Sequence, residues 1–75
     1  MSEIVARIAD DLAREALELA ADLQDDDLVG ELARVIGAGS TTTQEAFMTA
    51  VRIRMAETRA RDWLAARRAR GAEGR

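Results

Sequence analysis

The chain has 75 residues and a formal net charge of −3, and all 11 of its basic residues are arginine. Hydrophobic residues make up 48% of the sequence, but 16 of them are alanine, and Phe47 and Trp63 are the only aromatic residues. The absence of cysteine and histidine excludes disulfides, thiol or imidazole catalysis, and zinc sites built from those ligands. No apolar run approaches the roughly 20 residues of a membrane span and no signal peptide begins the chain, so the sequence predicts one small cytoplasmic domain without a membrane partner.

The two halves of the chain carry opposite charge. Residues 1–37 contain ten acidic residues and three arginines, which gives a net charge of −7. Residues 38–75 contain four acidic residues and eight arginines, which gives a net charge of +4. Two arrangements account for this separation: one half folds back on the other, or the basic end meets an acidic partner.

Apolar periodicity predicts a first helix over residues 3–23, with Ser2 as its N-cap. Seven apolar residues lie within about 120° of one another around this helix. They are Ile4, Val5, Ile8, Leu12, Ala16, Leu19 and Leu23. A second helix is predicted over residues 26–36, begun by the aspartates at 25–27 and ended by Gly37.

A third helix is predicted over residues 42–69, where Thr42 and Glu45 have the spacing of a capping box. The apolar stripe on its first face ends at Met55. This helix would be about 40 Å long, whereas a compact domain of this size is only about 30 Å across. We therefore expect residues 1–56 to form a helical core domain, and residues 57–75 to form an arginine-rich helix and tail that projects from it.

No motif in the sequence supports catalysis, a cofactor or a metal ion. The run Asp25-Asp26-Asp27 lacks the spaced ligands and the glycine of a calcium loop, so it is interpreted as a turn and helix start. Residues 37–40 lack the lysine of a phosphate-binding loop, and no histidine or lysine activates the hydroxyls of residues 40–43. The sequence predicts a protein that is not an enzyme and that uses neither cofactor nor metal.

The arginine-rich segment around Trp63 is the candidate binding site, because an aromatic side chain flanked by arginines has the composition of an interface anchor. An exposed helix end, with arginines at the negative end of the helix dipole and Trp63 folded over the core, is an alternative. Contact with nucleic acid is a further alternative, although the acidic first half would repel a duplex. The residues predicted to contact an acidic protein partner are Arg59, Trp63, Leu64, Arg67, Arg68 and Arg70.

Residues 26–65 contain three motifs that occur together in one known family: the run from Asp26 to Leu32, the run from Ser40 to Arg52, and the arginine-rich helix that follows. On these motifs the segment resembles the VapB-type antitoxins. The resemblance implies a ribbon-helix-helix dimer that represses its own operon and blocks a PIN-domain ribonuclease with its arginine-bearing tail. The segment before Asp26 completes the apolar stripe of the first helix, however, so the N-terminal segment is predicted as helix and not as the DNA-binding strand of that family.

The resemblance also implies roles for individual residues. It implies a dimer core made of Leu28, Leu32, Phe47, Ala50 and Val51. It implies a toxin-facing surface made of Trp63, Leu64, Arg67 and Arg68.

The predicted fold is mainly α, a small three-helix domain that is dimeric or a higher oligomer, because a chain this short buries only about 60% of its extended surface. The predicted function is that of a non-enzymatic, antitoxin-like binding protein that engages an acidic protein partner through its C-terminal helix. The alternative is a structural helical module that oligomerises with itself and has neither a nucleic-acid nor a toxin partner.

Overall fold

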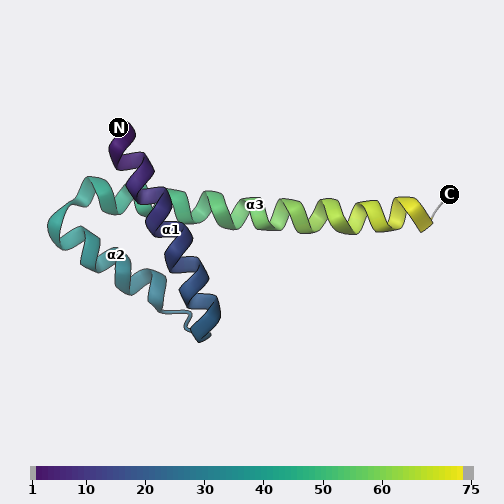
Figure 1. The fold of residues 1–75 in the computed structure, drawn as a ribbon, viewed down its shortest axis with the longest axis horizontal. Helices are drawn as coiled ribbons and strands as arrows, with labels where there is room; N and C mark the ends of the chain where they lie inside the picture. Colours follow the sequence, from purple (N-terminus) through teal and green to yellow (C-terminus); the bar gives the residue numbers. More distant parts are fainter. Residues whose placement is uncertain (1, 74–75) are drawn as a thin grey trace.

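The computed structural model describes residues 2–73, with side chains described as far as Gly71, and contains three helices joined by short turns (Figure 1). Helix α1 spans Glu3–Leu23, α2 spans Leu28–Gly39 and α3 spans Thr41–Glu73. The described residues contain no strand. The predictions of a mainly α fold and of a helical N-terminal segment are therefore confirmed.

Local hydrogen bonds set the two ends of α1. The Ser2 Oγ accepts a hydrogen bond from the Val5 N–H at 3.3 Å, so Ser2 is the N-cap that the sequence predicts. Beyond Leu23, Gln24 adopts the left-handed conformation, with φ 53° and ψ 44°. Its N–H donates to carbonyls in the last turn of α1, and this closes the helix.

The aspartates at 25–27 form a turn before α2 begins. The Asp25 carboxylate accepts a hydrogen bond from the Asp27 N–H at 3.0 Å, which is the pattern of an Asx turn. Asp27 occupies the N-cap position of α2 without making a side-chain capping bond. Helix α2 therefore begins at Leu28 instead of residue 26, because Asp25 uses its carboxylate to close the turn.

Ser40 ends α2 and begins α3. Its N–H donates to the Ile36 carbonyl at 2.9 Å, and its Oγ accepts from the Thr43 N–H at 3.1 Å. The predicted capping box of Thr42 and Glu45 is wrong, since both residues lie inside α3. The same capping chemistry operates two residues earlier, with Ser40 as the N-cap.

Gly37 lies inside α2, which continues to Gly39, so the prediction that Gly37 ends this helix is wrong. The Gln44 Nε2 of α3 donates a hydrogen bond to the Ala33 carbonyl of α2 at 3.0 Å. A Cβ on residue 37 would collide with the Gln44 amide. Glycine at this position therefore makes room for a side chain that ties α3 to α2.

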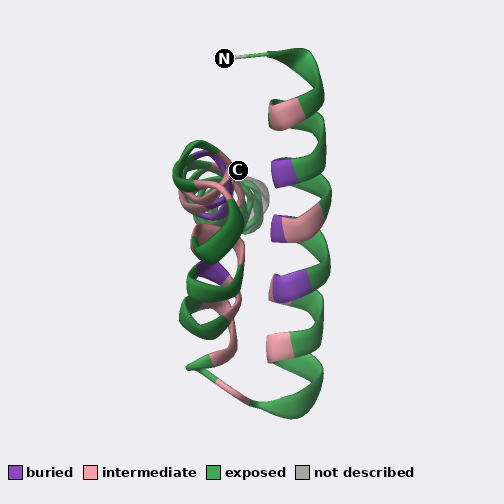
Figure 2. Cartoon of the chain, turned by 90° about the vertical axis from the view of Figure 1, so that its left-hand side faces the viewer, coloured by how far each residue is buried: buried purple, intermediate pink, exposed green. Residues whose placement is uncertain are grey.

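The helices pack in two layers, with α1 in one layer and α2 and the first turns of α3 in the other (Figure 2). The buried residues lie between the layers and form a single cluster. They are Ala9, Ala13, Ala16, Ala33, Ala46, Phe47 and Val51. Phe47 is the large side chain that is fully enclosed among the described residues, so this core is small and aliphatic apart from one ring.

Only part of the apolar stripe of α1 is covered. The centre of its buried face is formed by alanines, with Ala13 fully buried. By contrast, Ile4 is 62% exposed and Leu19 is 48% exposed. Alanine allows the helices to approach closely, so the small side chains face the core and several of the larger ones remain on the rim.

Helix α3 leaves the other two helices and continues alone (Figure 1). The longest dimension of the chain is 55 Å and its radius of gyration is 15.8 Å, whereas a compact chain of this length has a radius of gyration of about 11 Å. Every residue from 55 to 70 is exposed. We call residues 57–73 the arm and residues 2–56 the head. None of the helices in the described residues is long and apolar enough to span a membrane.

Truncation of Phe47 tests the core. Because this ring is fully buried, Phe47→Ala should lower the free energy of unfolding by about 3–5 kcal/mol, which is comparable to the total stability of a small domain. Val35 is 70% exposed, so Val35→Ala should change the free energy of unfolding by no more than about 0.5 kcal/mol. Urea unfolding followed by circular dichroism measures both, and equal effects of the two substitutions would contradict this core.

Candidate protein-binding surface on α3

Three of the predicted binding residues lie on one side of α3. Successive residues of an α-helix are rotated by about 100°, so Arg59, Trp63 and Arg70 fall within about 40° of one another around the axis. Trp63 is 62% exposed, and the arginines beside it are exposed as well. Arg52 is also exposed and lies within this angular range. We call these four residues the Arg/Trp face.

Arg52 is a residue that the sequence interpretation missed. Arg52 lies outside the dense arginine segment, which begins at Arg59. The spacing could have identified Arg52, because it precedes Arg59 by seven residues and Trp63 precedes Arg70 by the same interval. Seven residues correspond to nearly two helical turns, so such pairs lie on the same side of a helix.

The other predicted binding residues point elsewhere. Leu64 is rotated from Trp63 by about 100°, and Arg67 lies between these two directions, about 40° from Trp63. Arg68 lies about 160° from the centre of the Arg/Trp face. One flat partner surface therefore cannot contact all six predicted residues, because neighbours in a helical sequence project in different directions.

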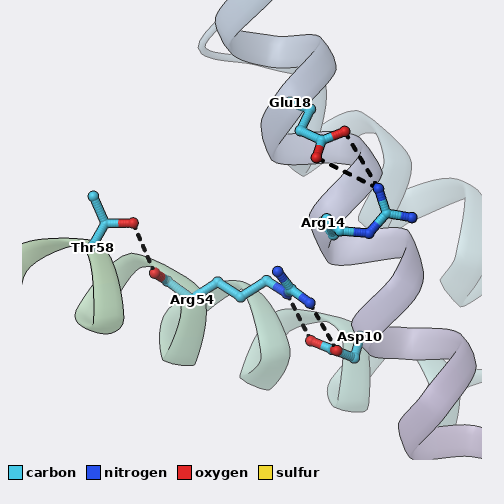
Figure 3. A network of polar contacts seen from close by, with 5 residues as sticks. All are labelled: Asp10, Arg14, Glu18, Arg54 and Thr58. Carbon is cyan, nitrogen blue, oxygen red and sulfur yellow. Dashed lines mark hydrogen bonds and ion pairs between the residues drawn. The ribbon is translucent and has the colours of Figure 1, made fainter. Parts of the chain in front are cut away.

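Two arginines of α3 are engaged within the chain. The Nε and Nη2 of Arg54 donate to the Oδ1 and Oδ2 of Asp10 at 2.7 and 2.8 Å, and this bidentate pair fastens α3 to α1 (Figure 3). Arg61 binds Glu57 of the preceding turn at 2.8 Å. No arginine of the Arg/Trp face forms an ion pair with a side chain that the structure describes. The charges of the Arg/Trp face are therefore directed to the surroundings.

The Asp10–Arg54 contact shifts the ionisation of both groups. The hydrogen bonds from Arg54 are the main cause of a lowered pKa at Asp10. Desolvation opposes this shift, and the positive charges of Arg54 and Arg14 add to it. In return, the hydrogen bonds to Asp10 raise the pKa of Arg54 above its ordinary value. Both shifts favour the charged pair in the folded chain.

The five residues that the resemblance implies for a dimer core lie in different parts of the head. Phe47 and Val51 are 0% and 4% exposed within their own chain, so a second copy cannot contact them in this conformation. Leu28 and Leu32 line an open groove of about 380 Å³ between α1 and α2. Ala50 lines a separate hollow of about 240 Å³ between α1 and α3. These residues do not form one continuous surface.

The side chains described by the structure include no cluster of three or more acidic residues placed to hold a metal ion. Comparisons with models of protein families, with characterised proteins and with solved structures found no match to this chain. The functional argument therefore rests on the chemistry of its surfaces.

Acid titration tests the contact between α1 and α3. Because the folded-state pKa of Asp10 is lowered, its ion pair stabilises the fold above the unfolded-state pKa of about 4, and this contribution is lost as pH falls through the lower folded-state pKa. Asp10→Asn should reduce stability at pH 7 and make the remaining stability less sensitive to acid. Urea unfolding at a series of pH values measures this effect.

Asp11→Asn is the matched control for the titration, because Asp11 is exposed and forms no ion pair with a described side chain. Its stability should follow that of the unmodified chain across the pH series. Identical pH profiles for Asp10→Asn and Asp11→Asn would contradict the role given to Asp10.

Proposed function

We propose that this chain is a non-enzymatic binding protein, antitoxin-like in its mode of action, that engages an acidic protein partner through the arm of α3. The Arg/Trp face is the observation that carries this proposal. Trp63 is 62% exposed on a helix that has left the head, and arginines lie on the same side of the helix before and after it. Tryptophan and arginine are the residues most enriched at the energetic centres of protein interfaces.

The chemistry of the Arg/Trp face favours a groove that contains carboxylates. Guanidinium groups bind carboxylates with two parallel hydrogen bonds and are weakly hydrated, so they enter interfaces more readily than lysine does. No acidic residue shares this side of α3 between residues 49 and 71. An exposed helix with an aromatic anchor is suited to docking in a groove of its partner.

A protein partner is favoured over nucleic acid by the charge of the head. Residues 1–37 carry a net charge of −7, which would oppose the approach of a phosphate backbone. The resemblance to VapB-type antitoxins implies a DNA-binding strand just before Asp26, but in this chain the residues up to Leu23 belong to helix α1. The proposal therefore includes the partner-binding half of that resemblance and leaves out its DNA-binding half.

A structural module that oligomerises only with itself is the second candidate function. It is supported by large aliphatic side chains that remain in contact with water on the head. Val35 is 70% exposed, Ile53 is 64% exposed and Leu23 is 61% exposed. A second copy that covered such residues would stabilise a chain whose own core is small.

Truncation of Trp63 tests the proposed function. In the full chain, Trp63→Ala should weaken binding to a co-purified acidic partner by at least about 30-fold, because loss of an aromatic anchor costs 2 kcal/mol or more. Arg59→Ala should mainly slow association and reduce its salt dependence. Binding kinetics on immobilised partner, with circular dichroism to monitor helix content, measure these effects.

Met55→Ala is the matched control, since Met55 is an exposed apolar residue of α3 that lies about 80° from Trp63 around the helix. It should leave partner affinity nearly unchanged. The structural-module function holds instead if Trp63→Ala unfolds the chain, or if it dissociates a homo-oligomer while no acidic partner co-purifies from the native host.

A further inference from the structure

A second side of α3 carries a heptad pattern that is separate from the Arg/Trp face. Its residues are spaced alternately by four and three positions, as in the seam of a coiled coil. They are Ile53, Glu57, Ala60, Leu64, Arg67 and Gly71. We call them the heptad face, which lies about 100° around the helix from the Arg/Trp face. Ile53 is 64% exposed and Leu64 is 46% exposed, so this face is open along the arm.

We propose that the heptad face pairs with the heptad face of a second copy of this chain, antiparallel and centred on residue 62. In this register, residues equally distant from position 62 lie opposite each other across the two helices. Ala60 then meets Leu64, Glu57 meets Arg67, and Ile53 meets Gly71. The two-fold symmetry of the pair forms each of these layers twice.

In this register each pair of facing residues is complementary in size or in charge. A large side chain faces a small one where Leu64 meets Ala60 and again where Ile53 meets Gly71, which allows the two helices to interdigitate closely. The two charged residues of the seam, Glu57 and Arg67, have opposite signs and face each other. One sequence therefore supplies both halves of each contact.

The same residues disfavour the other arrangements. A parallel pair would place Glu57 against Glu57 and Arg67 against Arg67, and like charges in contact are strongly unfavourable. An antiparallel pair shifted by one heptad would place Arg67 opposite Ala50 or opposite Leu64. In either shift both seam charges lose their partners, so the register centred on residue 62 is selected.

Two of the three arginines at one edge of the seam are already paired within their own chain. Arg54 and Arg61 flank the heptad face and would lie near arginines of the second copy. Within its own chain, however, Arg54 already binds Asp10 at 2.7 and 2.8 Å, and Arg61 already binds Glu57 at 2.8 Å. Arg54 is therefore compensated by Asp10 of its own chain, and in the pair the Glu57 carboxylate lies between Arg61 of its own helix and Arg67 of the second copy.

Long-range charge also favours an antiparallel pair. In the proposed register the end of one arm, at Gly71, lies beside Ile53 of the second copy. Ile53 lines an open hollow together with Ala6 and Asp10 of α1. The arm, from the half of the chain with net charge +4, thus reaches the half with net charge −7 of the other copy.

The pairing is tested separately from the proposed partner contact, because the residues substituted below lie on the heptad face and not on the Arg/Trp face. Trp63 lies at the edge of the seam, close to the two-fold axis, so the variants that test the pairing leave Trp63 unchanged. The chain contains no cysteine, and cysteines introduced at chosen positions will report only on those positions.

Charge reversal in the full chain tests the seam. Sedimentation velocity should show a dimer of the unmodified chain, and Glu57→Arg and Arg67→Glu should each weaken it by at least about tenfold, because each places like charges opposite each other. The double variant Glu57→Arg/Arg67→Glu should recover an affinity within about threefold of the original. Asp62→Arg changes the charge equally on the other side of α3 and should have little effect.

Disulfide formation tests the direction of the helices. A mixture of Ala60→Cys and Leu64→Cys chains should form a disulfide between positions 60 and 64, whereas Leu64→Cys alone, which a parallel pair would join, should not. A chain that stays monomeric at roughly 100 µM overturns the proposal, since a specific dimer should form well below this concentration. It is also overturned by a dimer that the single reversals leave intact, by failure of the double variant to recover, or by efficient 64–64 cross-linking.

Discussion

Phe47 lies in a buried cluster whose other members are mostly alanines, and the extent of this cluster limits the whole fold. The alanines of α1 allow α3 to cross it closely, and one aromatic ring fills the space between the two layers. Along α3 the buried cluster ends at Val51, and beyond it Leu17 of α1 only lines an open pocket together with Met55 and Thr58. Helix α3 nevertheless continues for about six more turns, of which those beyond residue 56 form the exposed arm.

The arginines of α3 project in different directions around the helix. Arg52 and Arg54 are only two residues apart, but they point to opposite sides of the helix. Arg54 faces α1 and binds Asp10, whereas Arg52 faces outward on the Arg/Trp face. The proposed partner contact uses the side of Arg52 and the proposed self-pairing uses a third direction, so one helix provides three distinct surfaces without additional structural elements.

Local sequence signals were sufficient where only one residue could perform a given role. Ser2 is the only hydroxyl near the start of α1, and it is the N-cap in the structure. At the start of α3, by contrast, four consecutive hydroxyl residues compete, and the sequence interpretation selected Thr42. Ser40 caps the helix because the end of α2 and the Gln44–Ala33 hydrogen bond place this residue at the junction. The role of Gly37 depends on the same contact and has no local signal.

The helical class, the limits of α1 and the excess length of α3 can be predicted from local sequence. These features follow from apolar periodicity, from short-range capping and from a third segment that no proline or glycine interrupts before Gly71. The packing of the helices shows in addition that alanines, and not the larger aliphatic residues, form the buried face of α1. It also shows that Arg54 is neutralised by Asp10 and that Phe47 and Val51 are enclosed within a single chain. The reason is physical: these outcomes depend on how helices distant in sequence cross, and periodicity within one helix contains no information about that crossing.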